Sequence, residues 1–226
     1  RIIDNIFFSK IRICDWSNYY ELKSKIIEFI NEEKRITNPF ILNCLIDDPK
    51  LNKKASEQYI SFINNDLKEQ ISFGRKAKEK PKIAYFSGDF KEHATMHLIL
   101  DVFKNHSHLN FDFYAFSLVE HEKDDWNKDL NQYFKKIINI QNLTDQEVAN
   151  LAREMKIDIA IDLKGFTQDS RPKIFLNRCA PIQINFLGYP GTMGSKHFDY
   201  IIADKIVIPE NQKKNYSEDI IYIETK

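Results

Sequence analysis

The chain has 226 residues, of which 42% are hydrophobic and 13% aromatic, so it can bury the core of one ordinary domain with an appendage. Lysine plus arginine and aspartate plus glutamate number 33 each, which leaves a formal net charge of zero. This balance gives no reason to expect nucleic acid or an anionic membrane as a partner.

Residues 1 to about 78 are predicted to be helical. One helix starts behind Ser17, a plausible N-cap, and a second runs from Leu51 to about Ile71. The pairs Asn38-Pro39 and Asp48-Pro49 interrupt the helical pattern. Each helix has one apolar face with helical spacing, formed by Leu22, Ile26, Phe29 and Ile30 in the first and by Tyr59, Ile60, Ile63 and Leu67 in the second.

A run of charged residues, Gly74–Lys80, separates this helical part from the rest of the chain. We interpret the run as a solvated linker rather than a basic binding patch. It predicts a boundary between a helical junction, residues 1–78, and a second unit, residues 79–226.

The second unit alternates apolar runs with helical patterns, which is typical of an α/β fold with a parallel sheet. Strands are predicted at residues 83–86, 111–119, 137–140, 157–163, 182–187 and from residue 200. Helices are predicted at 97–103, up to about residue 134, after a capping box at Thr144–Glu147, and at 170–177, where Pro172 is tolerated in the first turn. We therefore predict a Rossmann-like, doubly wound sheet preceded by an α-helical segment.

Ligands of such sheets bind at the carboxyl ends of the strands. Three polar or glycine-bearing turns are predicted there: Ser87–Asp89, Lys164-Gly165 and Gly188–Gly194. Their glycines would let backbone amides approach a phosphate or a sugar, although the last run is also explained as a bare tight turn. None of the three fits the dinucleotide or Walker A pattern.

The first of these turns leads to two histidines, His93 and His97, which are four residues apart. They lack a third ligand and the glutamate of HExxH, so no metal site is expected. His93 lies near Asp89 and Glu92, whose carboxylates can set its charge. Two structural alternatives remain open: the ring of His97 packs on the sheet, and Asp89 only caps the following helix.

No two aspartates are separated by a single residue, so an Asp-x-Asp site for a metal and a diphosphate is not available. An anionic leaving group would rely on backbone amides, helix N-termini, lysine or histidine.

The cysteines Cys14, Cys44 and Cys179 are far apart and form no CxxC pair, which argues against a disulfide framework and favours a reducing compartment. No apolar run approaches the ~20 residues that cross a bilayer, and no signal peptide is visible. We expect a cytoplasmic protein without a membrane partner. Because the chain starts without Met and ends in the apolar run 220–223, we also expect a piece of a longer protein.

Six blocks, in this order along nearly the whole chain, resemble the protein O-GlcNAc transferase family, which includes SPINDLY-like members. They are Cys14-Asp15-Trp16, Ser87-Gly88-Asp89-Phe90 with His93 and His97, Lys164-Gly165-Phe166-Thr167, Arg178-Cys179-Ala180-Pro181-Ile182-Gln183, Leu187-Gly188-Tyr189-Pro190-Gly191-Thr192 and Asp199-Tyr200-Ile201-Ile202-Ala203-Asp204. The resemblance implies a metal-independent, inverting glycosyltransferase of the GT-B type, which has two Rossmann-like lobes. Residues 1–78 resemble its helical junction and residues 79–226 its first catalytic lobe.

The resemblance also implies roles for individual residues. Asp89 matches an aspartate proposed to assist removal of the acceptor proton, and His93 matches a histidine at the sugar and phosphate end of the donor site. Both are therefore catalytic candidates. The candidates for binding donor or acceptor are Thr95, His97, Lys164, Gly165, Leu187, Gly188, Tyr189, Pro190, Gly191 and Thr192, of which the last six match the segment that lies against the transferred sugar.

The implied reaction moves a sugar, N-acetylglucosamine from UDP-GlcNAc in most of the family and fucose in some relatives, onto Ser or Thr of acceptor proteins without a metal cofactor. The implied partners are a second catalytic lobe and N-terminal tetratricopeptide repeats of the same polypeptide. Without that lobe, this chain alone is not expected to be active.

The chain departs from higher-eukaryotic members, which carry Asn-His-Pro where it has Glu92-His93-Ala94 and a junction histidine where it has Thr37–Phe40. Two other functions are compatible with the same residues: a self-contained flavodoxin-like binding or regulatory module, and a GT-B glycosyltransferase that acts on small molecules.

Overall fold

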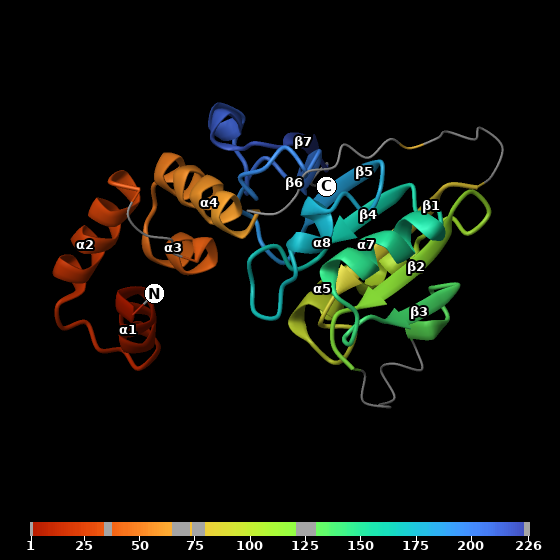
Figure 1. Ribbon diagram of the computed structural model, residues 1–226, viewed down its shortest axis with the longest axis horizontal. Coiled ribbons are helices and arrows are strands. Elements are labelled where there is room, and N and C mark those ends of the chain that lie inside the picture. The colour runs from red at the N-terminus through yellow and green to blue at the C-terminus, as the bar shows by residue number, and fades with distance from the viewer. Residues whose placement is uncertain (1, 34–37, 65–72, 74–79, 121–129, 224–226) are drawn as a thin grey trace.

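A computed structural model describes residues 2–33, 38–64, 73, 80–120 and 130–223. Four helices come first: α1 (Ile2–Arg12), α2 (Tyr19–Asn31), α3 (Pro39–Leu45) and α4 (Pro49–Ile63). Figure 1 shows α1 to α3 gathered at one end of the molecule, with the sheet at the other end. The helical character predicted for this part is confirmed. The end of the predicted second helix lies outside the described residues, as do nearly all of the predicted linker and most of the helix expected before residue 134.

The helix starts differ from prediction in two respects. The Asn-Pro and Asp-Pro pairs begin helices: Asn38 accepts a hydrogen bond from Phe40 N, Asp48 accepts from Lys50 N and Leu51 N, and proline takes the first helical position. Ser17 does not cap α2. The N-cap is Asn18, in the left-handed region at φ 59°, because the Ser17 hydroxyl donates instead to Asp15 Oδ1 at 2.6 Å.

The rest of the chain forms a parallel sheet in the order β3-β2-β1-β4-β5-β6-β7. Its strands are β1 (Lys82–Ser87), β2 (Asp112–Ser117), β3 (Lys136–Asn139), β4 (Ile159–Asp162), β5 (Ile182–Phe186), β6 (Tyr200–Ala203) and β7 (Asp219–Tyr222). The six predicted strands are confirmed, and β7 is an addition at the edge. Because the chain leaves β1 toward β2 on one side and returns to β4 on the other, the topological switch point lies between β1 and β4.

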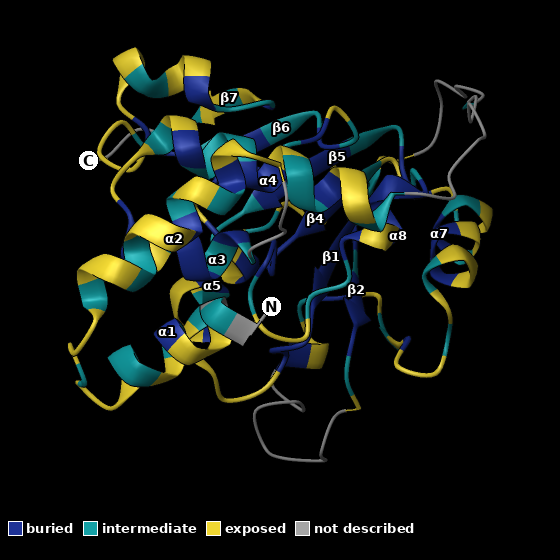
Figure 2. Cartoon of the chain, turned by 60° about the vertical axis from the view of Figure 1, so that its left-hand side comes forward, coloured by how far each residue is buried: buried dark blue, intermediate teal, exposed yellow. Residues whose placement is uncertain are grey.

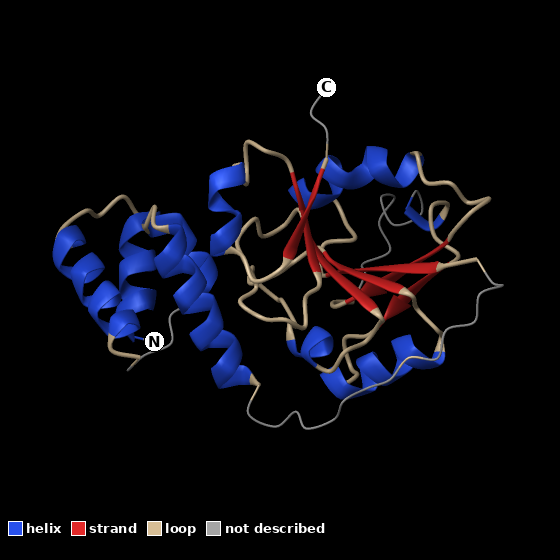
Figure 3. Ribbon diagram, turned by 90° about the horizontal axis from the view of Figure 1, so that it is seen from above, coloured by secondary structure: helices blue, strands red, loops and turns tan. Residues whose placement is uncertain are grey.

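Helices cover both faces of the sheet, as seen from above in Figure 3. On one face α5 (Ala94–Lys104) packs on the sheet through Met96, Ile99 and Phe103. On the other face lie α7 (Asp145–Glu154) and α8 (Lys173–Leu176). The capping box predicted before α7 is present. Figure 2 shows the buried strands between these layers and the exposed outer sides of α1 and α2.

Helix α4 joins the two parts of the molecule. Leu51 and Ala55 belong to the core of the N-terminal helices, whereas Ile60 belongs to the core under α7 and α8. The connection from β5 to β6, residues 187–199, is fully described and contains no helix. Because α4 packs on this connection, it occupies the layer that a crossover helix would fill in a regular α/β unit. The boundary at residues 78 and 79 stays a prediction, but α4 contributes to both cores.

Among the described residues, no helix is both long and apolar enough to cross a bilayer.

Candidate functional site

The switch point of the sheet carries an ion pair. Asp89 follows β1 and Lys164 follows the neighbouring strand β4. Lys164 Nζ donates to Asp89 Oδ2 at 2.7 Å, and the two residues are only 5% and 7% exposed. The Ser87 hydroxyl accepts from the Asp89 amide at 3.0 Å and fixes its backbone. The carboxylate therefore points to Lys164 and does not cap α5.

His93 is the N-cap of α5. Its Nδ1 accepts from Thr95 N at 3.2 Å and lies 3.6 Å from Asp89 Oδ2. A ring nitrogen that accepts an amide proton carries none itself, so the neutral ring has its proton on Nε2. The side chain is 42% exposed. His93 thus presents an N–H donor at the start of a helix, where the helix dipole favours a negative charge.

Two further predicted residues lie on the same helix. Thr95 is half-buried in the first turn of α5, and His97 is exposed one turn beyond His93. The alternative that the His97 ring packs on the sheet is therefore wrong, because Met96 and Ile99 take the positions that face it. Among the described residues, no group of three or more histidines, cysteines or acidic side chains is arranged to hold a metal ion.

A second carboxylate lies next to the ion pair and is not among the predicted site residues. Asp162, the last residue of β4, is 3% exposed, and its Oδ1 accepts from Lys164 N at 2.8 Å. Burial raises the pKa of Asp162 to about 7, although the amides of Lys164 and Gly165 oppose the shift. Asp162 fixes the turn from which Lys164 reaches Asp89. An aspartate at the end of an otherwise apolar run was the signal for it in the sequence.

Of the glycines in the predicted turns, all except Gly88 are explained by close contacts within the protein. A Cβ on Gly165, which has φ 55°, would lie 2.4 Å from Tyr189 Cβ, and one on Gly188 would lie 2.0 Å from Leu163 O. Side chains at these positions would drive the ends of β4 and β5 apart. The two turns therefore pack against each other, and the rim that carries the ion pair continues into residues 188–194.

Tyr189 was predicted to bind donor or acceptor, but its side chain is buried and is not available to a ligand. It is 1% exposed, and its ring meets that of Phe166 edge-on at 5.2 Å. Burial also raises the pKa of its hydroxyl. Leu187 and the backbone of the turn lie on the expected rim, but the Tyr189 ring forms part of the core.

A cavity of about 520 Å³ opens beside this turn. Its walls are three separate pieces of chain: the end of α3 with the start of α4, the turn Pro190–Thr192, and a segment before β7. The lining residues are Asn43, Cys44, Leu45, Ile46, Asp47, Pro49, Asn52, Pro190, Gly191, Thr192, Val207, Asn215 and Tyr216. Of these, only the residues of the turn are among those predicted. The cavity unites them with the N-terminal helices.

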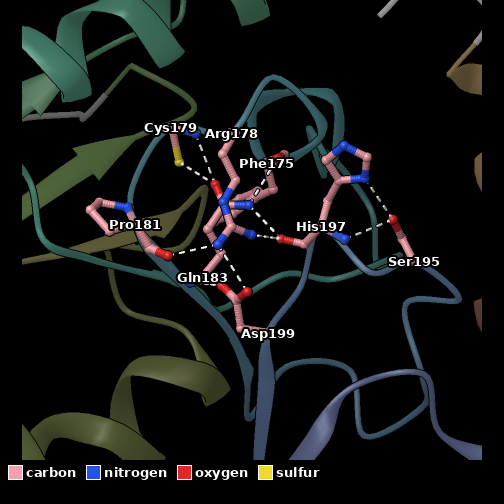
Figure 4. A network of polar contacts seen from close by, with 8 residues as sticks. All are labelled: Phe175, Arg178, Cys179, Pro181, Gln183, Ser195, His197 and Asp199. Atoms are coloured by element: carbon pink, nitrogen blue, oxygen red, sulfur yellow. Dashed lines mark hydrogen bonds and ion pairs between the residues drawn. The ribbon is translucent and has the colours of Figure 1, made fainter. Parts of the chain in front are cut away.

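The block Arg178–Gln183 lies at the opposite rim, where β5 and β6 begin (Figure 4). Arg178 donates to His197 O, Pro181 O and Asp199 Oδ1. Gln183 Nε2 donates to Phe175 O at 2.9 Å and to His197 O, and its Oε1 accepts from Cys179 N. These side chains are engaged mainly by backbone groups, so this block holds the start of the strands together.

Comparisons with known proteins agree with this architecture. The model of glycosyl transferase family 41 matches residues 13–226. A probable UDP-N-acetylglucosamine–peptide N-acetylglucosaminyltransferase, SEC, of Arabidopsis thaliana is 30% identical over 142 residues, which cover 63% of this chain and 14% of that protein. A Caenorhabditis elegans UDP-N-acetylglucosamine–peptide N-acetylglucosaminyltransferase is 24% identical over 227 residues, 93% of this chain and 20% of that protein. This chain thus spans a fifth or less of these relatives.

A solved structure of a mutant Thermobaculum terrenum O-GlcNAc transferase has the same fold. The two superpose with a TM-score of 0.75 at 22% identity, over 82% of this chain and 36% of that one.

Proposed function

The chain belongs to glycosyl transferase family 41, and we propose that it forms the first catalytic lobe of an inverting, metal-independent enzyme that transfers a sugar from a nucleotide donor to proteins. Relatives bear names that specify UDP-N-acetylglucosamine and peptide substrates. We therefore propose UDP-GlcNAc as donor and Ser or Thr of proteins as acceptor. Membership of the family favours this function over a self-contained flavodoxin-like module.

The observation that carries the proposal is the grouping of Asp89, Lys164 and His93 at the switch point of the sheet. Ligands of doubly wound sheets bind at this point. In an inverting transfer, the acceptor oxygen gives up its proton to a base and forms a bond to the anomeric carbon as the bond from that carbon to the diphosphate oxygen breaks. The diphosphate leaves with the electron pair, so negative charge develops on it.

Residues of this chain are placed to stabilise that negative charge. His93 Nε2–H and the first amides of α5 offer donors toward an anion, and such preorganised donors stabilise a charge that develops during the reaction. The Thr95 amide holds the His93 ring through Nδ1, and Lys164 holds Asp89 beside it. The cavity beside Pro190–Thr192 is where we propose that the transferred sugar lies.

The remaining parts of the enzyme are proposed from the greater length of the relatives. We propose that a second catalytic lobe supplies most contacts to the nucleotide and that tetratricopeptide repeats select the acceptor protein. All three cysteines are free, in keeping with a cytoplasmic location.

Two His93 variants in the longer protein test this function. His93→Asn keeps an oxygen that can cap α5 but removes the imidazole, whereas His93→Ala removes both. We expect both variants to lose roughly 10²–10³ in the rate of sugar transfer, as when one donor to a developing anion is lost. Only His93→Ala should also lose about 1 kcal/mol of stability, the usual cost of a missing cap.

His108→Ala is the matched control, because it removes an exposed histidine beyond the other end of α5. Melting curves and transfer rates are measured on the same preparations. Near-normal transfer by His93→Asn would contradict the proposal and leave the histidine as a helix cap.

A further inference from the structure

The turn that forms one wall of the cavity is held by a buried carboxylate far along the chain. Glu218, just before β7, is 5% exposed. Its Oε2 accepts from the Thr192 hydroxyl at 2.6 Å, and its Oε1 accepts from the Met193 amide. Thr192 lines the cavity. Glu218 thereby holds the cavity wall at Thr192 in place through contacts inside the protein.

Neighbouring groups complete a clasp between residues 215–218 and the turn. The Tyr216 hydroxyl donates to Pro190 O at 3.0 Å, and Ser217 N donates to Thr192 Oγ1 at 3.1 Å. Lys53 of α4 donates to the carbonyl oxygens of Lys214 and Tyr216, at 3.2 Å each. The wall and the segment opposite it are thus tied to each other and to the N-terminal helices.

A contribution to stability does not by itself explain why position 218 carries a carboxylate. No ion pair is found for Glu218 within the described part of the chain, and its four donors are the uncharged groups Thr192 Oγ1, Met193 N and Ser217 N together with its own backbone amide. Burial raises the pKa of Glu218 because the charged form loses its hydration. A charge buried without a cation costs free energy, and here it is directed at one side of a cavity.

We propose that Glu218 is a positioning residue that acts through Thr192 and Met193 to hold the cavity wall in the shape that seats the transferred sugar. The seat itself rests on the proposed function. A wall that shifts would misplace the anomeric carbon relative to the acceptor, and a misplacement of about 1 Å can cost roughly 10²-fold in rate.

Three variants separate positioning from general stability. Glu218→Ala removes both acceptors, and Glu218→Gln keeps one carbonyl oxygen for the Met193 amide. Asp199→Asn is the matched control, because it removes a carboxylate that also accepts a backbone amide, from Gln183, but at the opposite rim of the sheet.

Hydrogen exchange of the chain 1–226 gives the first measurement. In Glu218→Ala we expect the amides of Met193 and Gly194 to exchange at least about tenfold faster. The reference is the Leu163 amide, which donates to Phe86 O of β1. Its exchange should change only with global stability. Asp199→Asn should change exchange without this local excess. Unaltered relative exchange at Met193 and Gly194 would overturn the proposal.

Sugar transfer by the longer protein gives the second measurement. We expect kcat/KM to fall about tenfold or more in Glu218→Ala, to stay within about threefold in Glu218→Gln, and to be unchanged in Asp199→Asn despite a lower Tm. A Glu218→Ala protein with a lower Tm and normal kcat/KM would reduce Glu218 to a structural role and overturn the proposal. Absence of transfer by the wild-type protein would instead overturn the proposed function, and exchange would then decide the role of Glu218 alone.

Discussion

The two rims of the sheet are both built from polar motifs, but they use them differently. At the amino ends of β5 and β6, the side chains of Arg178 and Gln183 donate hydrogen bonds to backbone carbonyls, and Arg178 also donates to Asp199. At the carboxyl ends of β1 and β4, Lys164 and Asp89 pair with each other, and the ring of His93 is left exposed. The rim at the amino ends, the closed rim, binds groups of its own chain. The rim at the carboxyl ends, the open rim, carries the groups that we propose act on a ligand.

This difference shows what a sequence motif can mean. The Arg178–Gln183 block belongs to the family resemblance just as the block around Asp89 does, yet its polar groups are engaged by contacts within the fold. Because ligands of parallel sheets bind at the carboxyl ends of strands, the rim on which a motif lies separates a structural role from a functional one. Variants at the two rims should therefore fail in different ways.

The largest effect is expected from Lys164→Met. It leaves the Asp89 carboxylate buried without its cation, which typically costs about 3–5 kcal/mol of stability. Adding Asp89→Asn removes the stranded charge and should recover most of that loss. We expect the double variant to melt close to the wild type but to remain defective in sugar transfer in the longer protein.

A double-mutant cycle of melting curves and transfer rates checks this. If the double variant stays as unstable as Lys164→Met, the pair is not the source of the loss. If it regains transfer together with stability, this rim is structural like the other one, and the comparison fails.

Arg178→Ala is the counterpart at the closed rim. It removes donors from His197 O and Pro181 O and takes the cation from Asp199, and we expect a loss of roughly 2–4 kcal/mol. Arg178→Lys should recover little, because one ammonium group cannot reach three separate acceptors in the planar geometry of a guanidinium. Transfer per folded molecule should be unchanged, and a fall in kcat/KM at full folding would show that this rim also serves the reaction.

Much of this architecture could be predicted from the chain because local patterns determine it. Short apolar runs bounded by polar turns gave the inner strands, and Thr144 with Glu147 gave a capping box that needs only residues three apart. The convergence of Asp89 and Lys164 followed from topology, since the strands of a parallel sheet all place their carboxyl ends on one rim.

What could not be predicted depends on contacts that local rules do not weigh, most of them between residues distant in sequence. The hydroxyl of Ser17 was available to cap α2 but bonds Asp15, which an N-cap rule does not weigh. The run of glycines suggested room for a ligand, whereas Gly194 makes room for α4: a Cβ there would lie 2.5 Å from Glu57 N. Glu218 meets Thr192 across 26 residues, and no local pattern signals that contact.

The smallest effect, and the finest test of the comparison, concerns Asp162 under the open rim. Its pKa is raised to about 7 from the ordinary 3.8 by burial. Between about pH 4 and pH 7 the folded chain therefore holds a proton that the unfolded chain has released. Stability falls with rising pH wherever the native state binds more protons, so Asp162 makes the free energy of unfolding decrease across this range.

Asp162→Asn cannot titrate, and its amide oxygen can still accept from the Lys164 amide. At pH 8 the variant avoids the cost of a buried charge, which stabilises it, but its neutral amide oxygen accepts weaker hydrogen bonds, which destabilises it. We expect the free energy of unfolding of the variant to exceed that of the wild type by about 1 kcal/mol at pH 8, or roughly 2–4 °C in Tm, and to be lower at pH 4–5. The histidines titrate equally in both proteins, so the difference in Tm between variant and wild type isolates Asp162. A difference that stays constant from pH 4 to pH 8 would mean that Asp162 remains charged, stabilised by the turn that it organises, and that the open rim holds its charges as firmly as the closed one.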